Sequence, residues 1–217
     1  DAQSEGCRSH HQRTSRGMIG NDIIDLNHAR KTSNIHHPRW ADKVLTEQEK
    51  KQIHHFPSLE TALWTFWAFK ESAYKIFFKK TGRRLFIPKR FQSTLTLLEP
   101  NLMESTIHSP LGKWYGQVQL WSDSIHALVT TQDSFFPNIR WQKLPLRQTI
   151  AAKQSKAVRQ GLLQSLYQQH QVPAEAISIS SPRQFPQVFL KNKVLPIDVS
   201  MSHHHQWGAF AFLQADH

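Results

Sequence analysis

One long segment with the features of a helix constrains the fold of this 217-residue chain more than any other part of it. Residues 58–80 are rich in Trp and Phe, Ser58 can cap the first turn, and Gly82 follows as a stop. Leu63 and Phe66 are among the residues that can pack this helix against the rest of the protein. We therefore expect one long helix that ends at Gly82.

Shorter elements are expected on both sides of this helix. Before it, Thr46 and Glu49 have the spacing of a capping box within residues 39–53. After it, alternating apolar and polar residues predict a small antiparallel meander. Its strands are expected at residues 91–98, 114–121 and 125–131.

The second half of the chain repeats the order of a helix followed by strands. A polar, proline-bearing passage around residues 137–147 leads to a second long helix at about 148–169. Strands are expected near residues 176–180, 187–190 and 197–201, and in the terminal WGAFAFLQ. This order predicts an α+β fold of two similar lobes, each a long helix packed on a small antiparallel sheet, related by a pseudo-two-fold axis.

The expected boundaries follow from this order. We place the first lobe at residues 18–140 and the second at residues 141–217. Residues 1–17 lack the apolar core of a secretory signal and are interpreted as a flexible extension or an expression remnant. The single cysteine, Cys7, lies there, which excludes a disulfide framework and a cysteine zinc site and favours a reducing cytoplasm.

The charge of the chain favours a polyanionic partner. Lys and Arg outnumber Asp and Glu by 27 to 16, which gives a formal net charge of +11. Such a surface suits nucleic acid, an acidic membrane, a phosphorylated cofactor or an acidic protein. No helix-turn-helix, RNP or zinc-finger pattern is present, and no apolar run approaches the roughly 20 residues that span a bilayer. We expect neither nucleic acid nor a membrane as the partner.

Two short segments carry residues with the chemistry of a metal site. In residues 19–26 (IGNDIIDL), a short apolar run is broken by Asp22 and Asp25. In the long helix, Glu71 and Lys75 lie four residues apart and project from one face. They fit an ordinary exposed pair worth about 0.3–0.5 kcal/mol, and the two aspartates fit caps or turn residues. Alternatively, Asp22 and Glu71 form a hard-oxygen site for Mg²⁺ with Lys75 on the phosphates of a substrate.

A resemblance to a known family favours the second interpretation. The segments GNDIIDL, PRWADKVLTEQE and FWAFKESAYK resemble the GxD…RF..R.L…(F/W)xxKExxxK signature of the 4′-phosphopantetheinyl transferase superfamily. VSMSHHHQWGAFAF is similar to that family's (I/L)S(I/L)SHxxxxxxxA(F/V) segment. The resemblance covers most of residues 18–217.

The resemblance implies roles for seven residues. Asp22 and Glu71 would bind Mg²⁺ on the pyrophosphate of coenzyme A, and Lys75 would contact phosphate. All three would be catalytic, with Glu71 as the base. The residues that would contact coenzyme A, besides Lys75, are Arg39, Lys43, Ser202 and His203.

Three departures from the family pattern bear on the site. Members of the surfactin type carry GxDxE, whereas this chain has Ile24 and then Asp25, so a water would replace the third carboxylate and Asp25 would support the site without binding metal. The lysine of the family's GKP turn is missing before Pro186, and Arg183 is the candidate substitute. The order of the two lobes is swapped, as in a circular permutation.

The adjacent histidines after Ser202 are interpreted separately. Consecutive side chains on a strand alternate between its two sides, so the three do not converge readily on one zinc ion. The resemblance assigns His203 to a phosphate or ribose contact, and His204 and His205 are expected to be loop residues.

The expected function is transfer of 4′-phosphopantetheine from coenzyme A to a serine of an acidic acyl or peptidyl carrier protein. The reaction is Mg²⁺-dependent and releases 3′,5′-ADP. A non-catalytic coenzyme A or carrier-binding module and a basic nucleic-acid-binding protein are the alternatives. We expect a monomer with one active site between its lobes, and a trimer with sites between subunits is the alternative assembly.

Overall fold

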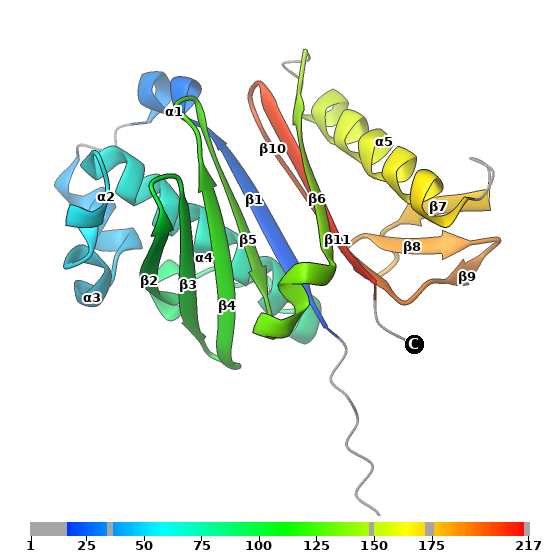
Figure 1. The fold of residues 1–217 in the computed structure, drawn as a ribbon, viewed down its shortest axis with the longest axis horizontal. Coiled ribbons are helices and arrows are strands. Elements are labelled where there is room, and N and C mark those ends of the chain that lie inside the picture. Colours follow the sequence, from blue (N-terminus) through cyan, green and yellow to red (C-terminus); the bar gives the residue numbers. More distant parts are fainter. Residues whose placement is uncertain (1–16, 34–36, 148–149, 172–175, 215–217) are drawn as a thin grey trace, which may run out of the picture.

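The computed structural model describes residues 17–33, 37–147, 150–171 and 176–214. The extension expected at residues 1–17 lies outside these ranges except for Gly17, and so does Cys7. Two α+β units lie next to each other, with one strand from each at the junction (Figure 1). No helix in the described residues is long and apolar enough to cross a membrane.

The first unit is a five-stranded antiparallel sheet with one long helix on its face. The sheet has the order β1-β5-β4-β3-β2, and α4 packs on β1 and β5. The elements are β1 (Ile19–Asp25), α1 (Leu26–Thr32), α2 (Pro38–Val44), α3 (Glu47–Lys50), α4 (Leu59–Thr81), β2 (Gln92–Glu99), β3 (Leu102–Ser109), β4 (Gly112–Leu120) and β5 (Ser124–Thr130). Short 3-10 turns occur at Ile53–His55 and Pro88–Arg90.

The second unit holds two small antiparallel sheets and a second long helix. One sheet has the order β10-β11-β6 and the other β7-β8-β9. The elements are a 3-10 helix (Asp133–Asn138), β6 (Ile139–Pro145), α5 (Ala151–His170), β7 (Ile177–Ser180), β8 (Gln187–Leu190), β9 (Lys193–Val194), β10 (Ile197–His204) and β11 (Trp207–Gln214). The α+β class is confirmed, while the two-fold relation and the boundary after residue 140 stay predictions.

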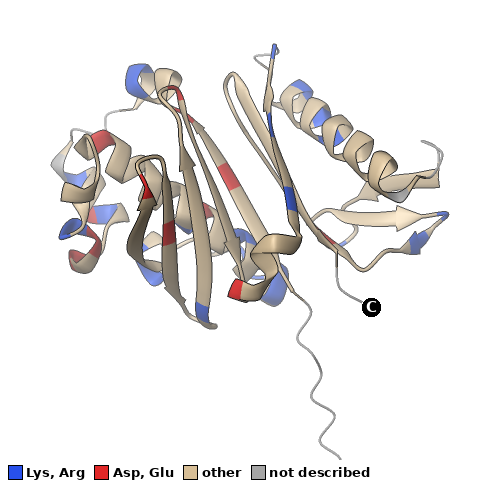
Figure 2. Cartoon of the chain, in the orientation of Figure 1, with Lys and Arg blue, Asp and Glu red and all other residues tan. Residues whose placement is uncertain are grey.

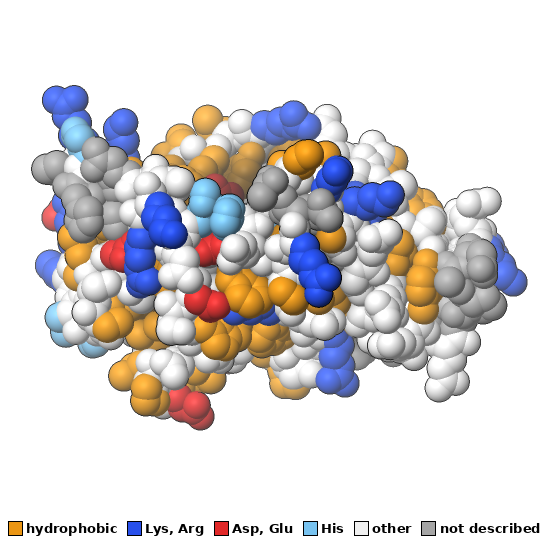
Figure 3. Space-filling model, turned by 90° about the horizontal axis from the view of Figure 1, so that it is seen from above, with side chains coloured by type: hydrophobic (Ala, Val, Ile, Leu, Met, Phe, Trp, Pro, Cys, Tyr) orange, Lys and Arg blue, Asp and Glu red, His pale blue; other side chains and the backbone are white. Residues whose placement is uncertain are grey.

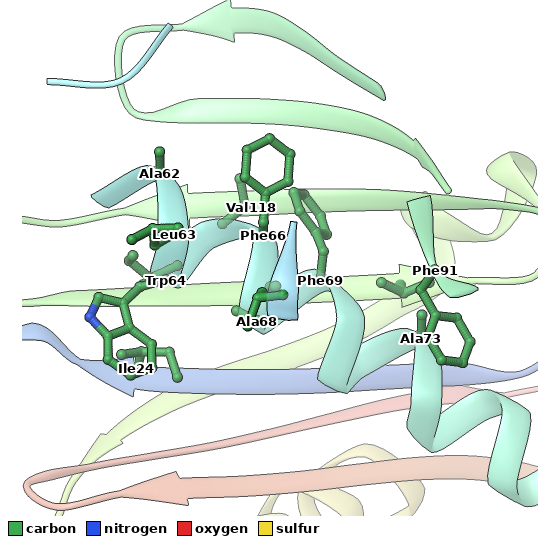
Figure 4. Close-up of a cluster of buried hydrophobic side chains, with 14 of the residues drawn as sticks. Ile24, Ala62, Leu63, Trp64, Phe66, Ala68, Phe69, Ala73, Phe91 and Val118 are labelled. Atoms are coloured by element: carbon green, nitrogen blue, oxygen red, sulfur yellow. The ribbon is translucent and has the colours of Figure 1, made fainter. Parts of the chain in front are cut away.

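The boundaries of α4 match the sequence prediction closely. The Ser58 side chain accepts a hydrogen bond from the backbone N–H of Thr61, and Gly82 ends the helix with φ 68°. Leu63, Phe66 and other side chains of α4 fill the space between the helix and the sheet (Figure 4). Burial on nearly every side explains why so many positions of this helix are aromatic or small.

Close packing also accounts for the glycine at the start of the first motif. A Cβ atom built on Gly20 would lie 1.9 Å from the backbone oxygen of Ser72 in α4. Only a residue without a side chain lets β1 approach the helix this closely. The approach brings the residues that follow Gly20 next to the face of α4 that carries Glu71 and Lys75.

A buried ion pair holds α3 and the edge strand β2 to α4. Lys70 and Glu49 are fully buried, and Lys70 Nζ donates to Glu49 Oε1 at 2.7 Å and to the carbonyl oxygen of Phe91 at 2.6 Å. Glu49 also accepts from the backbone N–H of Thr46 at 2.8 Å, which confirms the predicted capping box, and from that of Ser93 at 2.9 Å. One carboxylate therefore caps a helix and neutralises a buried lysine.

Replacing Lys70 by Met should lower the free energy of unfolding by about 3–5 kcal/mol, because Glu49 would remain buried without its counter-ion. Urea unfolding at pH 7 measures this change. The paired substitution Lys70→Met with Glu49→Gln should recover part of the loss. If Lys70→Met changed the free energy of unfolding by less than about 0.5 kcal/mol, the pair would contribute no more than an ordinary surface ion pair.

Candidate active site at the junction of the two units

The two units meet along β1 and β10, which belong to different sheets. Side chains of β10 accept hydrogen bonds from the free edge of β1. The backbone N–H groups of Ile19, Asn21 and Asp25 donate to Asp198 Oδ2 at 2.7 Å, Ser200 Oγ at 2.9 Å and His204 Nδ1 at 2.8 Å, respectively. Each pair is 179 residues apart, so the strands run in the same direction in one register. We call this contact the seam.

Two lysines of α4 satisfy carbonyl groups along the seam. Lys75 Nζ donates to the carbonyl oxygen of Asn21 at 2.6 Å and to Asp22 Oδ1 at 3.2 Å. Lys79 Nζ donates to the carbonyl oxygens of Ile19 at 2.8 Å and Val199 at 2.7 Å. The two lysines reach one line of contacts because residues four apart share a face of a helix.

The predicted metal ligands line one pocket. Asp22 comes from β1 and Glu71 from α4, and the pocket is closed by Ile23, Ile24, Trp40, Trp64, Trp67, His203 and His204. Burial raises the pKa of Asp22, although Lys75 opposes this shift. Burial, with the neighbouring charge of Asp22, raises the pKa of Glu71 to about 7. The two carboxylates therefore repel each other in a partly dehydrated space.

This donor set fits Mg²⁺. Within the described ranges, no group of three or more His, Cys, Asp or Glu side chains is arranged to hold a metal ion. Mg²⁺ does not need such a cage, because it commonly takes one or two carboxylates with waters and substrate phosphates. A divalent cation between Asp22 and Glu71 would offset the repulsion that raises the pKa of Glu71.

A second cavity lies between the units and touches the first. Its lining combines Lys75, Phe78 and Lys79 of α4 with Ser155 and Val158 of α5, Gln184–Pro186, and Val199–Met201 and His203 of β10. His203 lines both cavities, so they lie on either side of this residue. Burial and the charge of Lys75 lower the pKa of His203, which favours the neutral imidazole at pH 7.

The remaining predicted residues have different surroundings. Ser202 is buried, and its Oγ accepts from Asn21 Nδ2 at 3.1 Å. Arg39 and Lys43 are exposed on α2, the helix that contributes Trp40 to the pocket of the two acids. Arg183, the proposed substitute for the missing lysine, is exposed next to Gln184 at the cavity between the units.

Asp25 joins the units at the other end of the seam. Its carboxylate accepts from the backbone N–H of His28 at 3.0 Å, from that of Gln206 at 3.1 Å, and lies 3.1 Å from His205 Nδ1. Burial would raise the pKa of Asp25, but these hydrogen bonds hold it below its ordinary value. The His205 ring stacks on His28 with 4.0 Å between centroids. Asp25 thus caps α1 and binds the turn between β10 and β11.

Three residues near the site were not singled out from the sequence. Asn21 Nδ2 lies 3.3 Å from His126 Nε2 beneath the seam, and burial lowers the pKa of His126 to about 3. Lys79 is one turn beyond Lys75, and that spacing was the one available signal. The partners of Asn21 and His126 come from distant strands, so no local pattern indicates them.

The charges around the junction are mixed rather than uniformly basic. Lys and Arg are spread over both units (Figure 2). Seen from above, histidine and acidic side chains lie close together near the middle of the molecule, with Lys and Arg on either side (Figure 3). This arrangement suits an anionic ligand that also brings a cation.

Comparison with known proteins agrees with this geometry. No curated protein sequence matches the chain with significant similarity. The model of the 4′-phosphopantetheinyl transferase superfamily matches residues 18–129, slightly more than half of the chain, including β1, α2 and α4. The chain therefore belongs to the 4′-phosphopantetheinyl transferase superfamily.

Proposed function

We propose that this protein transfers 4′-phosphopantetheine from coenzyme A to a serine of an apo carrier protein in a Mg²⁺-dependent reaction. One observation carries the proposal: Asp22 and Glu71 line one pocket, beside Lys75, and His203 lines both this pocket and a cavity between the units. The lining of this cavity combines the partly exposed Lys75 with apolar side chains of both units, among them Phe78 and Val158. Such a lining suits a ligand with phosphates and a long uncharged arm.

The transfer is a phosphoryl substitution. The carrier serine oxygen forms a bond to the β-phosphorus of coenzyme A, and the bond from that phosphorus to the oxygen of 3′,5′-ADP breaks. Glu71, directly or through a water it orients, takes the serine proton. Asp22 and Glu71 would hold Mg²⁺, which would supply neutralisation of the pyrophosphate charge.

Lys75 and the basic surface would bind the phosphates and the carrier. Lys75 Nζ donates two hydrogen bonds within the protein and has three protons, and its side chain is 28% exposed at the cavity. His203, with Ser202 beside it, would contact the nucleotide. Arg39 and Lys43 are free to meet phosphate or an acidic carrier helix.

Several finer features belong to the same proposal. The protein would be of the holo-acyl-carrier-protein synthase type, monomeric and cytoplasmic, with its lobes in permuted order and related by a pseudo-two-fold axis. A contact within one chain carries no translational entropy cost of association, which favours the monomer over a trimer. Fatty-acid, polyketide and peptide-synthetase carriers are all candidate acceptors.

Incubation with coenzyme A, Mg²⁺ and a panel of apo carriers tests the proposal by intact-protein mass spectrometry. We expect one carrier to gain the mass of a single phosphopantetheine arm, and to gain nothing in EDTA. Binding of coenzyme A without transfer to any carrier would favour the non-catalytic module. Nucleic-acid binding with a steep negative salt dependence and no coenzyme A binding would favour the basic nucleic-acid-binding protein.

Asp22→Ala and Glu71→Ala should each lower kcat by about 100-fold or more, because metal-ion charge stabilisation is worth several kcal/mol. The melting temperature without metal should hold or rise, since each change removes one of two repelling carboxylates. Glu60→Ala is the matched control, because Glu60 also lies on α4 but pairs with Arg30. If Asp22→Ala or Glu71→Ala still transferred at the wild-type rate, the two carboxylates would not share a catalytic metal ion.

Thermal stabilisation by Mg²⁺ should grow as the pH rises from about 6 to 8. The folded pKa of Glu71 is raised to about 7 from an ordinary 4.5, so its contribution to stability is present below pH 4.5 and is lost as the pH rises through 7. Mg²⁺ competes with the proton for this carboxylate. Differential scanning fluorimetry measures the shift in melting temperature that Mg²⁺ causes, and Glu71→Gln should remove this shift. A shift that is equal at every pH contradicts the assignment.

A further inference from the structure

We propose that Lys79 and Asp198 form a positioning pair, which fixes the register of β10 against β1 and thereby holds the second unit's part of the active site opposite the metal ligands. This inference rests on the function proposed above. It assigns a role to two residues that take no part in the chemistry.

All three protons of the Lys79 ammonium group are used inside the protein. Nζ donates to Ile19 O at 2.8 Å, Val199 O at 2.7 Å and Asp198 Oδ2 at 2.8 Å. The side chain is 3% exposed. Asp198 Oδ2 accepts in addition from the backbone N–H of Ile19 at 2.7 Å. The pair thus joins α4, β1 and β10 at one point, with no proton of Nζ left for a ligand.

Lys75 differs from Lys79 although they lie one turn apart on the same face of α4. Lys75 contacts Asn21 and Asp22, both of β1, and its side chain is more exposed. It therefore belongs to one unit and is open to the cavity. Lys79 contacts both units and is closed to solvent. Lys75 is therefore available to bind phosphate, whereas Lys79 joins the two units.

Stability alone is a weak reason for such a pair. Burying two charges has a large desolvation cost, and apolar residues of similar volume often give equal or greater stability. A buried ion pair can instead specify one arrangement of its elements. A shift of β10 by one residue would place Val199 instead of Asp198 opposite Ile19, and would turn alternate side chains to the other face.

The register of β10 determines where His203 lies. His203 is five residues beyond Asp198 on the same strand and lines both cavities. A change at Asp198 would therefore move or loosen His203, which lines both the pocket of Asp22 and Glu71 and the cavity between the units. Misplacement by about 1 Å can lower a rate about 100-fold.

The test compares Lys79→Met with the double variant Lys79→Met/Asp198→Leu, assayed well below their melting temperatures. We expect kcat to fall by about 10- to 100-fold in both, while the double variant recovers most of the wild-type stability. Lys75→Met should chiefly raise the KM for coenzyme A. Met103→Ala, a buried position of β3 that β5 and β4 separate from the seam strand β1, is the control for lost stability and should keep kcat.

A double variant that recovers both stability and kcat would overturn the inference, because the pair would then serve stability alone. So would a Met103→Ala variant that loses as much kcat as Lys79→Met at equal destabilisation. Either result leaves the proposed function intact, since the wild-type protein transfers the arm in the same assay.

A distance measurement keeps the inference testable without any activity. With Cys7 replaced by Ser, spin labels at Lys113 and Lys191, both exposed and one in each unit, report the separation of the units by electron paramagnetic resonance. We expect Lys79→Met to broaden or shift the distance distribution and Met103→Ala to leave it unchanged. An unchanged distribution in Lys79→Met contradicts the positioning role, whether or not the protein is a transferase.

Discussion

The free edge of β1 is the constraint on which the rest of this structure depends. A strand edge between two sheets exposes backbone N–H and C=O groups that are costly to bury without partners. Within the part of the chain that the structure describes, no strand pairs with this edge of β1, and side chains form the hydrogen bonds instead. Asp198, Ser200 and His204 accept from the N–H groups of β1. Lys75 and Lys79 donate to its carbonyl oxygens. The same contacts join the units and place lysines and histidines beside Asp22.

The electrostatics of the site follow from this geometry. Joining the units removes water from Asp22 and Glu71, which raises the pKa of both groups, while Lys75 opposes the shift. One lysine does not neutralise two carboxylates. In the function we propose, a cation would offset the remaining repulsion, and the phosphates of the ligand would lie in the cavity lined by Lys75 and His203.

Local signals predicted the elements well. The ends of α4 were predicted from Ser58 and Gly82, and the capping box from Thr46 and Glu49, because each depends on hydrogen bonds within a few residues. Residues 139–145 were expected to lie in a polar passage, yet they form β6. That strand exists because β11 offers it a paired edge, and no local pattern shows this. β3 was missed for a similar reason, since it is stabilised between β2 and β4.

The site was predicted only as far as chemistry and family resemblance allowed. Asp22, Glu71 and Lys75 were named from their types and spacing, and the structure brings them together. Three lysines of α4 show the limit of such reasoning. Lys70 is a buried counter-ion, Lys75 faces the cavity and Lys79 joins the units, although all three belong to one helix. Their roles depend on partners that are far away in the sequence.

A crystal structure of the protein with Mg²⁺ and coenzyme A tests the central claim most directly. The account predicts a metal ion held by Asp22 and Glu71, with the pyrophosphate on Lys75 and the nucleotide against His203 of the same chain. Coenzyme A bound away from the seam would contradict it. So would a site whose metal ligands and His203 come from different chains.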